Sequence, residues 1–116
     1  MKTLSALLAI ILFFTFLSCS KSSDTTTPAT PTATINILAG MTYSPSTQTV
    51  AKGTIVFWKN TASVAHTATS NTGVFDTGTL SPGSTSTGYT ANTAGTYPYH
   101  CLIHGLTMAG TLIVNP

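Results

Sequence analysis

From residue 35 onward, short runs of alternating or β-branched residues follow one another, separated by turn signals. The strongest run, 54–60, is β-branched and aromatic almost throughout, which is typical of a strand. Such closely spaced short strands predict an all-β protein, a β-sandwich or barrel of about seven to eight strands. The expected strands are 35–38, 47–51, 54–60, 66–70, 84–90, 95–101 and 111–114, with turns at Tyr43-Ser44-Pro45, Lys52-Gly53 and Leu80-Ser81-Pro82-Gly83.

The composition agrees with strands and excludes one class of partner. The chain has 116 residues, of which four are basic and two acidic, so it has room for one domain and carries little charge. Thr and Gly, both frequent here, are weak helix formers. We expect no nucleic-acid partner, because no basic cluster exists to neutralise phosphates. The aromatic residues expected to fill much of the core are Trp58, Phe57, Phe75, Tyr97 and Tyr99.

The N-terminus predicts a targeting segment. The apolar run 4–17 is shorter than the roughly 20 residues that a transmembrane helix needs, and it suits a signal peptide. Phe16-Leu17-Ser18-Cys19 resembles a bacterial lipoprotein signal, apart from Phe16, where that pattern usually has Leu. We therefore expect residues 1–18 to be removed and Cys19 to carry lipid. Ordinary signal cleavage and an uncleaved anchor are the alternatives.

Residues 19–34 predict a tether. After Cys19 this stretch has no aliphatic residue larger than Ala, so it cannot bury enough apolar surface to fold. Its two prolines favour an extended chain. We expect it to hold a folded domain, residues 35–116, away from a membrane to which the lipid on Cys19 anchors it.

A run near the C-terminus contains three soft donors. Cys101, His104 and Met108 offer a thiolate, an imidazole and a thioether. With a second imidazole they form the ligand set of a mononuclear electron-transfer copper site. A hydrolytic zinc site would more commonly have three strong ligands and an open position for water. Residues i and i+3 of a strand face opposite ways, so Cys101 and His104 can share an ion only if the chain turns between them. Gly105 suits such a turn.

The second imidazole belongs to His66 or His100. Adjacent strand residues point to opposite faces of a sheet, so His100, next to Cys101, is expected not to bind the same ion. His66 is the remaining candidate. These residues also have ordinary structural interpretations: a buried inert thiol, a packed or surface histidine, and a core methionine. A disulfide between Cys19 and Cys101, the only two cysteines, is a further alternative.

Three segments together resemble the cupredoxin family, in particular proteins of the plastocyanin and amicyanin type. They are Val56-Phe57-Trp58-Lys59-Asn60 with Val64-Ala65-His66-Thr67, then Phe75-Asp76-Thr77-Gly78 with Leu80-Ser81-Pro82-Gly83, and the run from Gly95 to His104 followed by Met108-Ala109-Gly110. The resemblance implies a Greek-key β-sandwich over residues 35–116. It also implies one copper ion, bound by His66, Cys101, His104 and Met108.

The chain departs from that family at two points. Three residues separate His104 from Met108, a gap shorter than in plastocyanin-like loops and longer than in amicyanin-like loops. The axial bond, and with it the reduction potential, can therefore differ from those of relatives. Thr67 follows His66 where several relatives carry Asn, which helps to tie the two ligand loops together. A Thr hydroxyl could make that bond instead.

The resemblance implies a type 1 copper protein that passes single electrons between redox partners. The N-terminal signal and tether predict that it is anchored to a membrane outside the cytoplasm, in the periplasm or at the cell surface. A donor and an acceptor protein would dock on the uncharged, apolar residues around His104. The chain would act as a monomer and not as an enzyme. Two alternatives stay open: a protein that binds or delivers copper with the same fold, and a metal-free β-sandwich adhesion module.

Overall fold

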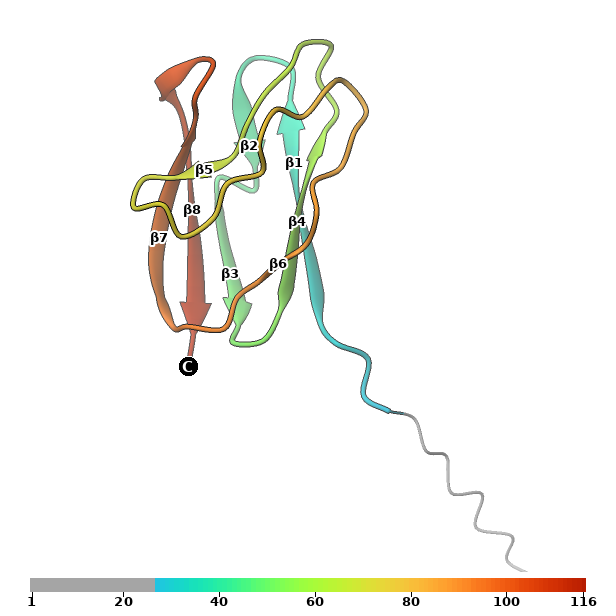
Figure 1. Cartoon of the computed structure of the whole chain (residues 1–116), viewed down its shortest axis with the longest axis vertical. Coiled ribbons are helices and arrows are strands. Elements are labelled where there is room, and N and C mark those ends of the chain that lie inside the picture. Colours follow the sequence, from blue (N-terminus) through green and yellow to red (C-terminus); the bar gives the residue numbers. More distant parts are fainter. Residues whose placement is uncertain (1–26) are drawn as a thin grey trace, which may run out of the picture.

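The computed structural model describes residues 27–116. In this part of the chain eight strands and no helix are present, and the strands form two four-stranded sheets (Figure 1). The expected all-β sandwich of about seven to eight strands is confirmed. One sheet has the order β2-β1-β4-β6 and the other β3-β8-β7-β5. The strands are β1 (Thr32–Leu38), β2 (Thr42–Ser44), β3 (Thr47–Ala51), β4 (Ile55–Asn60), β5 (Thr69–Ser70), β6 (Tyr89–Thr90), β7 (Gly95–Cys101) and β8 (Gly105–Asn115).

Each sheet contains one parallel pair of strands. β1 runs parallel to β4, and β3 runs parallel to β8. Parallel neighbours need a connection that crosses over, and between β1 and β4 the chain visits the other sheet as β3. This crossing ties the two sheets together. β7 and β8 instead form an antiparallel hairpin, whose turn consists of residues 102–104.

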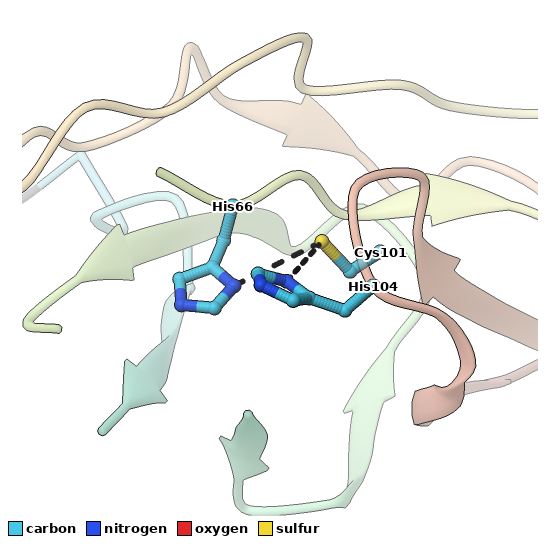
Figure 2. A group of neighbouring side chains, drawn as sticks. All are labelled: His66, Cys101 and His104. Carbon is cyan, nitrogen blue, oxygen red and sulfur yellow. Dashed lines mark hydrogen bonds between the residues drawn. The ribbon is translucent and has the colours of Figure 1, made fainter. Parts of the chain in front are cut away.

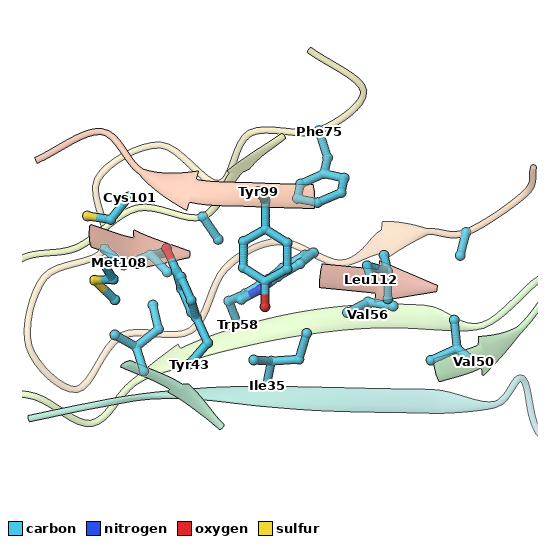
Figure 3. Close-up of a cluster of buried hydrophobic side chains, with 14 of the residues drawn as sticks. Ile35, Tyr43, Val50, Val56, Trp58, Phe75, Tyr99, Cys101, Met108 and Leu112 are labelled. Atoms are coloured by element: carbon cyan, nitrogen blue, oxygen red, sulfur yellow. The ribbon is translucent and has the colours of Figure 1, made fainter. Parts of the chain in front are cut away.

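The core lies between the sheets and follows the alternation of the strands (Figure 3). In β1 the side chains of Ile35 and Ile37 are fully buried, and in β4 those of Val56 and Trp58 are buried. Successive residues of a strand point to opposite faces, so their neighbours are more exposed. Trp58 stacks on Phe75, with ring centroids 4.9 Å apart.

Two of the five aromatic residues expected in the core do not belong to its buried part. Trp58, Phe75 and Tyr99 are buried, whereas Phe57 and Tyr97 are only half-buried. Phe57 faces outward because its neighbour Trp58 faces inward. The ring of Tyr99 lies against Gly110 of β8, where an added Cβ would come within 2.5 Å of it. Gly110 therefore leaves room for this ring.

Several strand boundaries differ from the expected ones. β1 begins at Thr32 and not at residue 35, because residues 32–34 pair with residues 55–57 of β4. The last three residues of the expected tether thus belong to the first strand. The expected turn at Tyr43 is the short strand β2, which pairs with β1. β8 begins at Gly105, well before the expected residue 111.

Two expected strands are much shorter than the alternation of their residues indicates. The run 66–70 is reduced to β5 and the run 84–90 to β6. In each, a hydroxyl takes the place of a backbone partner. The Trp58 N–H donates to Ser86 Oγ over 2.9 Å, and the Ala68 N–H donates to Thr77 Oγ1 over 2.9 Å. The backbone hydrogen bonds between strands therefore end at the residues whose N–H groups bond to a hydroxyl side chain.

The two ends of the sandwich carry different parts of the chain. Figure 1 shows residues 27–31 at the lower end, where the C-terminus also lies, whereas the turn between β7 and β8 lies at the upper end. Both sheets and the core cluster are contained in residues 32–116. Among residues 27–116 no helix is long and apolar enough to cross a membrane. The expected signal peptide, residues 1–18, and Cys19 lie outside the described residues.

Candidate metal centre

Two imidazoles and one thiol meet beside the β7–β8 turn (Figure 2), which lies at the upper end of the sandwich in Figure 1. One ring nitrogen each of His66 and His104 and the Sγ atom of Cys101 lie within 4.8 Å of one another. Cys101 Sγ is 3.5 Å from His104 Nδ1 and 3.8 Å from His66 Nδ1. The ring centroids of the two histidines are 4.7 Å apart. Within residues 27–116 this is the one such group of His, Cys, Asp or Glu side chains able to hold a metal ion.

The turn between β7 and β8 brings Cys101 and His104 together. β7 ends at Cys101, and residues 102–104 fold back so that Gly105 pairs with Cys101. Gly105 has a φ of 69°, in the left-handed region that a residue with a Cβ adopts at a cost. Glycine therefore suits this corner. The expected turn after Cys101, relieved by Gly105, is confirmed.

A bulge in β8 lies beside this turn. At the end of β7, a step of one residue corresponds to a step of four residues in β8, so residues 106–108 bulge from the ladder. Thr107 Oγ1 donates to the carbonyl oxygen of His104 over 2.9 Å, which holds the bulge against the turn. The three-residue gap between His104 and Met108 is taken up in this bulge.

Met108 lies in the core at the same end as the cluster. Its side chain is 1 % exposed and belongs to the same buried cluster as Cys101. Figure 3 shows the sulfur atoms of Cys101 and Met108 at one end of that cluster. This burial suits both a core methionine and a weak axial ligand. Binding of an ion by Met108 stays a prediction.

His100 lies apart from the cluster. It pairs with Thr69 of β5, and its Nδ1 forms a hydrogen bond of 2.5 Å with Asn71 Oδ1. His100 is partly exposed, whereas the next residue, Cys101, is fully buried. The two neighbours occupy opposite faces of the strand, as the alternation of β residues predicts.

Backbone and amide hydrogen bonds hold His66 in place. The His66 N–H donates to the Leu80 carbonyl over 3.1 Å, and the Leu80 N–H donates to the His66 carbonyl over 2.7 Å. Asn60, fully buried at the end of β4, donates from Nδ2 to the carbonyl oxygens of Val64 and Leu80, each over 2.8 Å. Its Oδ1 accepts from the Ala62 N–H over 2.9 Å. The sequence did not reveal this supporting role, since Asn at the end of a strand is also an ordinary turn residue.

Thr67 connects the two loops that carry the candidate ligands. Its N–H donates to Cys101 Sγ over 3.3 Å, and its Oγ1 accepts from the Leu102 N–H over 2.9 Å. The expectation that a Thr hydroxyl could tie the loops together is confirmed. The carbonyl oxygen of Thr67 accepts from the buried hydroxyl of Tyr43 over 2.5 Å. Tyr43, expected in a turn, is a second supporting residue that the pattern did not indicate.

Burial and neighbouring groups shift two pKa values at the site. Burial lowers the pKa of His66, and the nearby His104 lowers it further. His66 is thus held in the neutral form that a metal-binding imidazole requires. Burial raises the pKa of the Tyr43 hydroxyl, and Cys101 and Tyr99 raise it further. Tyr43 therefore stays a neutral donor.

The donors present fit a soft, redox-active metal. Within residues 27–116, Cys101 forms no disulfide and no nitrogen of the His66 ring is hydrogen-bonded to an oxygen atom. The Nδ1 atoms of His66 and His104 both face the sulfur (Figure 2). Imidazole and thiolate together with a thioether are the donor types of mononuclear copper sites.

Comparison with known proteins leads to the same family. A purple cupredoxin from Nitrosopumilus maritimus is 28% identical, with a TM-score of 0.65 over 72% of this chain and 99% of that one. A reduced amicyanin mutant is 25% identical, with a TM-score of 0.65 over 72% and 82% of the two chains. The Cu(I) form of another amicyanin mutant is 27% identical, with a TM-score of 0.65 and the same coverage. A search of curated proteins found no match. The model of the Cupredoxin-like domain matches residues 7–114, and the chain belongs to this family.

Proposed function

We propose that this protein carries single electrons with one copper ion held by His66, Cys101, His104 and Met108. The observation that carries the proposal is the meeting of two imidazoles and one thiol within 4.8 Å. Bound there, copper would supply one-electron chemistry by cycling between Cu(I) and Cu(II). The solved structures similar to this chain support the choice of metal, since one of them is a Cu(I) form of amicyanin.

The contribution of the protein is to keep the donors in fixed positions. Thr67 holds the Cys101 loop through its N–H and its hydroxyl, and Leu80 holds His66 through two backbone bonds. Ligands oriented by such surrounding bonds move little when the charge of the site changes, so electron transfer needs little reorganisation. Four ligands would leave no open position for a substrate, which favours electron transfer over catalysis.

Redox partners would dock on the apolar residues around His104. Leu102, Ile103 and Leu106 are 58, 50 and 73 % exposed, and His104 itself is partly exposed. We call these three residues the apolar patch. Grouped, exposed, large apolar side chains mark interaction surfaces. Because the patch carries no charge, a donor or an acceptor protein would meet the monomer in a short hydrophobic encounter, with His104 as the electron port.

The N-terminal part supports a place at a membrane outside the cytoplasm. Residues 1–18 would be the signal peptide, and Cys19 would carry lipid. Residues 27–31 lie at the end of the sandwich opposite the β7–β8 turn (Figure 1), so a tether attached there would leave the apolar patch accessible. We propose that the mature protein is lipid-anchored in the periplasm or on the cell surface.

Cyclic voltammetry of residues 20–116 loaded with copper tests the function. We expect a reversible one-electron wave and no loss of copper over repeated cycles. Met108→Leu should keep the wave and raise the reduction potential, since the axial ligand tunes it. An unchanged potential would remove Met108 from the ligand set. Ready transfer of copper to an acceptor, without a reversible wave, would favour copper delivery instead.

A further inference from the structure

A row of hydrogen bonds runs from the loop of Cys101 to the protein surface. The Leu102 N–H donates to Thr67 Oγ1 over 2.9 Å, and Thr67 Oγ1 lies 3.0 Å from Thr69 Oγ1. Thr69 Oγ1 in turn donates to Asp76 Oδ1 over 3.0 Å. Thr67 is buried, Thr69 half-buried and Asp76 exposed. The row therefore joins the backbone beside a candidate ligand to a surface carboxylate.

The two ends determine the direction of every bond in this row. A carboxylate only accepts, so the single proton of the Thr69 hydroxyl goes to Asp76. The Thr69 oxygen must then accept the proton of the Thr67 hydroxyl. The Thr67 oxygen in turn accepts from the Leu102 N–H. All the donors point toward the carboxylate, an arrangement in which each bond polarises and strengthens the next.

Asp76 is itself held in a fixed position. Its Oδ1 also accepts from the Gly78 N–H over 2.9 Å, and its backbone bridges to that of Thr69. The next residue, Thr77, donates from its N–H to the Ala68 carbonyl over 3.1 Å. The segment that contains Asp76 is thus docked along β5, and its carboxylate is presented to the Thr69 hydroxyl. Residues 76–78 have no part in the proposed electron transfer.

We propose that Thr69 and Asp76 are positioning residues that act on the loop of Cys101 through Thr67. With Thr69 as its acceptor, the Thr67 hydroxyl has one orientation, and its oxygen faces the Leu102 N–H. Without that acceptor the hydroxyl is free to rotate, and the bond to Leu102 weakens. The bond from the Thr67 N–H to Cys101 Sγ starts from the same residue. The order of this loop can be measured on the metal-free protein, whereas its importance for electron transfer rests on the proposed function.

Amide hydrogen exchange, followed by NMR on metal-free residues 20–116, tests this role. Thr69→Val removes the hydroxyl and keeps the shape, and the Leu102 amide should then exchange about two to five times faster, since its bond to Thr67 is weakened and loss of a whole hydrogen bond corresponds to about fivefold. Thr69→Ser keeps the hydroxyl and should keep the slow exchange. Asp76→Asn keeps an acceptor but not the charge and should cause a smaller increase. Thr90→Val, an exposed threonine of β6, is the control.

Two outcomes would overturn the proposal. One is an exchange rate of the Leu102 amide that is the same in Thr69→Val and Asp76→Asn as in the control. The other is equally fast exchange in Thr69→Ser and Thr69→Val, because rescue requires the hydroxyl. If Thr69→Val loses protection throughout the core, Asp76→Asn decides alone, since Asp76 is exposed.

A second arm separates this proposal from the proposed function. The same amides are followed after Cu(I), which is diamagnetic, is added to the native chain and to Thr69→Val. We expect copper to slow the exchange of the Leu102 amide in both, with Thr69→Val still the faster. If the metal-free results hold but Cu(I) does not bind, the positioning role stands and the electron-transfer function fails.

Discussion

Two buried tyrosines form a matched pair at the inner side of the site. The hydroxyl of Tyr43 donates to the Thr67 carbonyl, whereas the hydroxyl of Tyr99 interacts with the Trp58 indole without a well-formed hydrogen bond among the described residues. Both rings are buried, and their centroids are 4.7 Å apart. Removal of the Tyr43 hydroxyl deprives a buried carbonyl of a donor, and removal of the Tyr99 hydroxyl does not.

We expect Tyr43→Phe to lower the free energy of unfolding by about 1 kcal/mol, the usual net contribution of a hydrogen bond. Tyr99→Phe should lower it much less or raise it, since a buried hydroxyl without a well-formed hydrogen bond costs free energy. Urea denaturation of the metal-free protein measures both changes. Equal losses in the two variants would contradict the hydrogen-bond pattern at Thr67.

The lowered pKa of His66 makes stability depend on pH. At a pH below the ordinary histidine pKa of 6.5, the unfolded chain binds a proton at His66 more readily than the folded chain does. The metal-free protein should therefore have its full stability above pH 6.5 and lose stability as the pH falls toward the lower folded-state pKa. Urea denaturation at several pH values measures this, and His66→Gln should reduce the slope. A His66→Gln slope equal to that of the native chain would show that His66 is not the group responsible.

Among single residues, the sequence indicates the candidate ligand side chains better than the residues that support them. Cys101 and His104 stand at a spacing with chemical meaning, and His66 was the remaining imidazole. The supports, Asn60 and Tyr43, act on backbone atoms brought near by the fold. Nothing in the residue type or the spacing of a single sequence indicates such contacts.

Among the elements, the β7–β8 hairpin makes the site. The turn after Cys101 could be predicted, because two candidate ligands at i and i+3 can share an ion only if the chain turns between them. The start of β8 at Gly105 could not. A bulge breaks the alternation of two, so the run 105–110 does not have the pattern of a strand, although residues 105, 109 and 110 pair with β7.

The left-handed conformation of Gly105 makes the β7–β8 turn sensitive to substitution. Gly105→Ala should lower the free energy of unfolding by about 1–2 kcal/mol, since a Cβ strains that conformation. No atom lies within 4 Å of the position that the Cβ would take, so the cost comes from the backbone alone. Gly105→Asn should cost less, because Asn adopts this region more readily. Urea denaturation measures both, and an Ala variant as stable as the native protein would contradict the turn.

For the whole molecule, the two-layer architecture could be predicted and the strand order could not. Apolar residues at every second position place one face of each sheet in the core. The choice of partner is not local: the parallel pair of β3 and β8 joins strands near opposite ends of the fold's sequence. Periodicity sets which face is buried, but it does not name the neighbouring strand.

The apolar patch leads to a prediction about encounters between molecules. Leu106→Lys should slow electron self-exchange between the Cu(I) and Cu(II) forms by about tenfold at low salt, because two like-charged patches repel. NMR line broadening measures this rate. Thr49→Lys adds the same charge on β3, away from the patch, and should have little effect. Equal slowing by the two variants would assign the effect to net charge and not to docking at the patch.

The most direct test of the copper site is the visible and electron paramagnetic resonance spectrum of residues 20–116 after addition of Cu(II). We predict an intense thiolate-to-copper charge-transfer band in the native chain. Cys101→Ser should abolish this band while both imidazoles remain. A native chain that stays colourless would contradict the copper site and favour a metal-free β-sandwich. A band that survives Cys101→Ser would contradict the role of that sulfur.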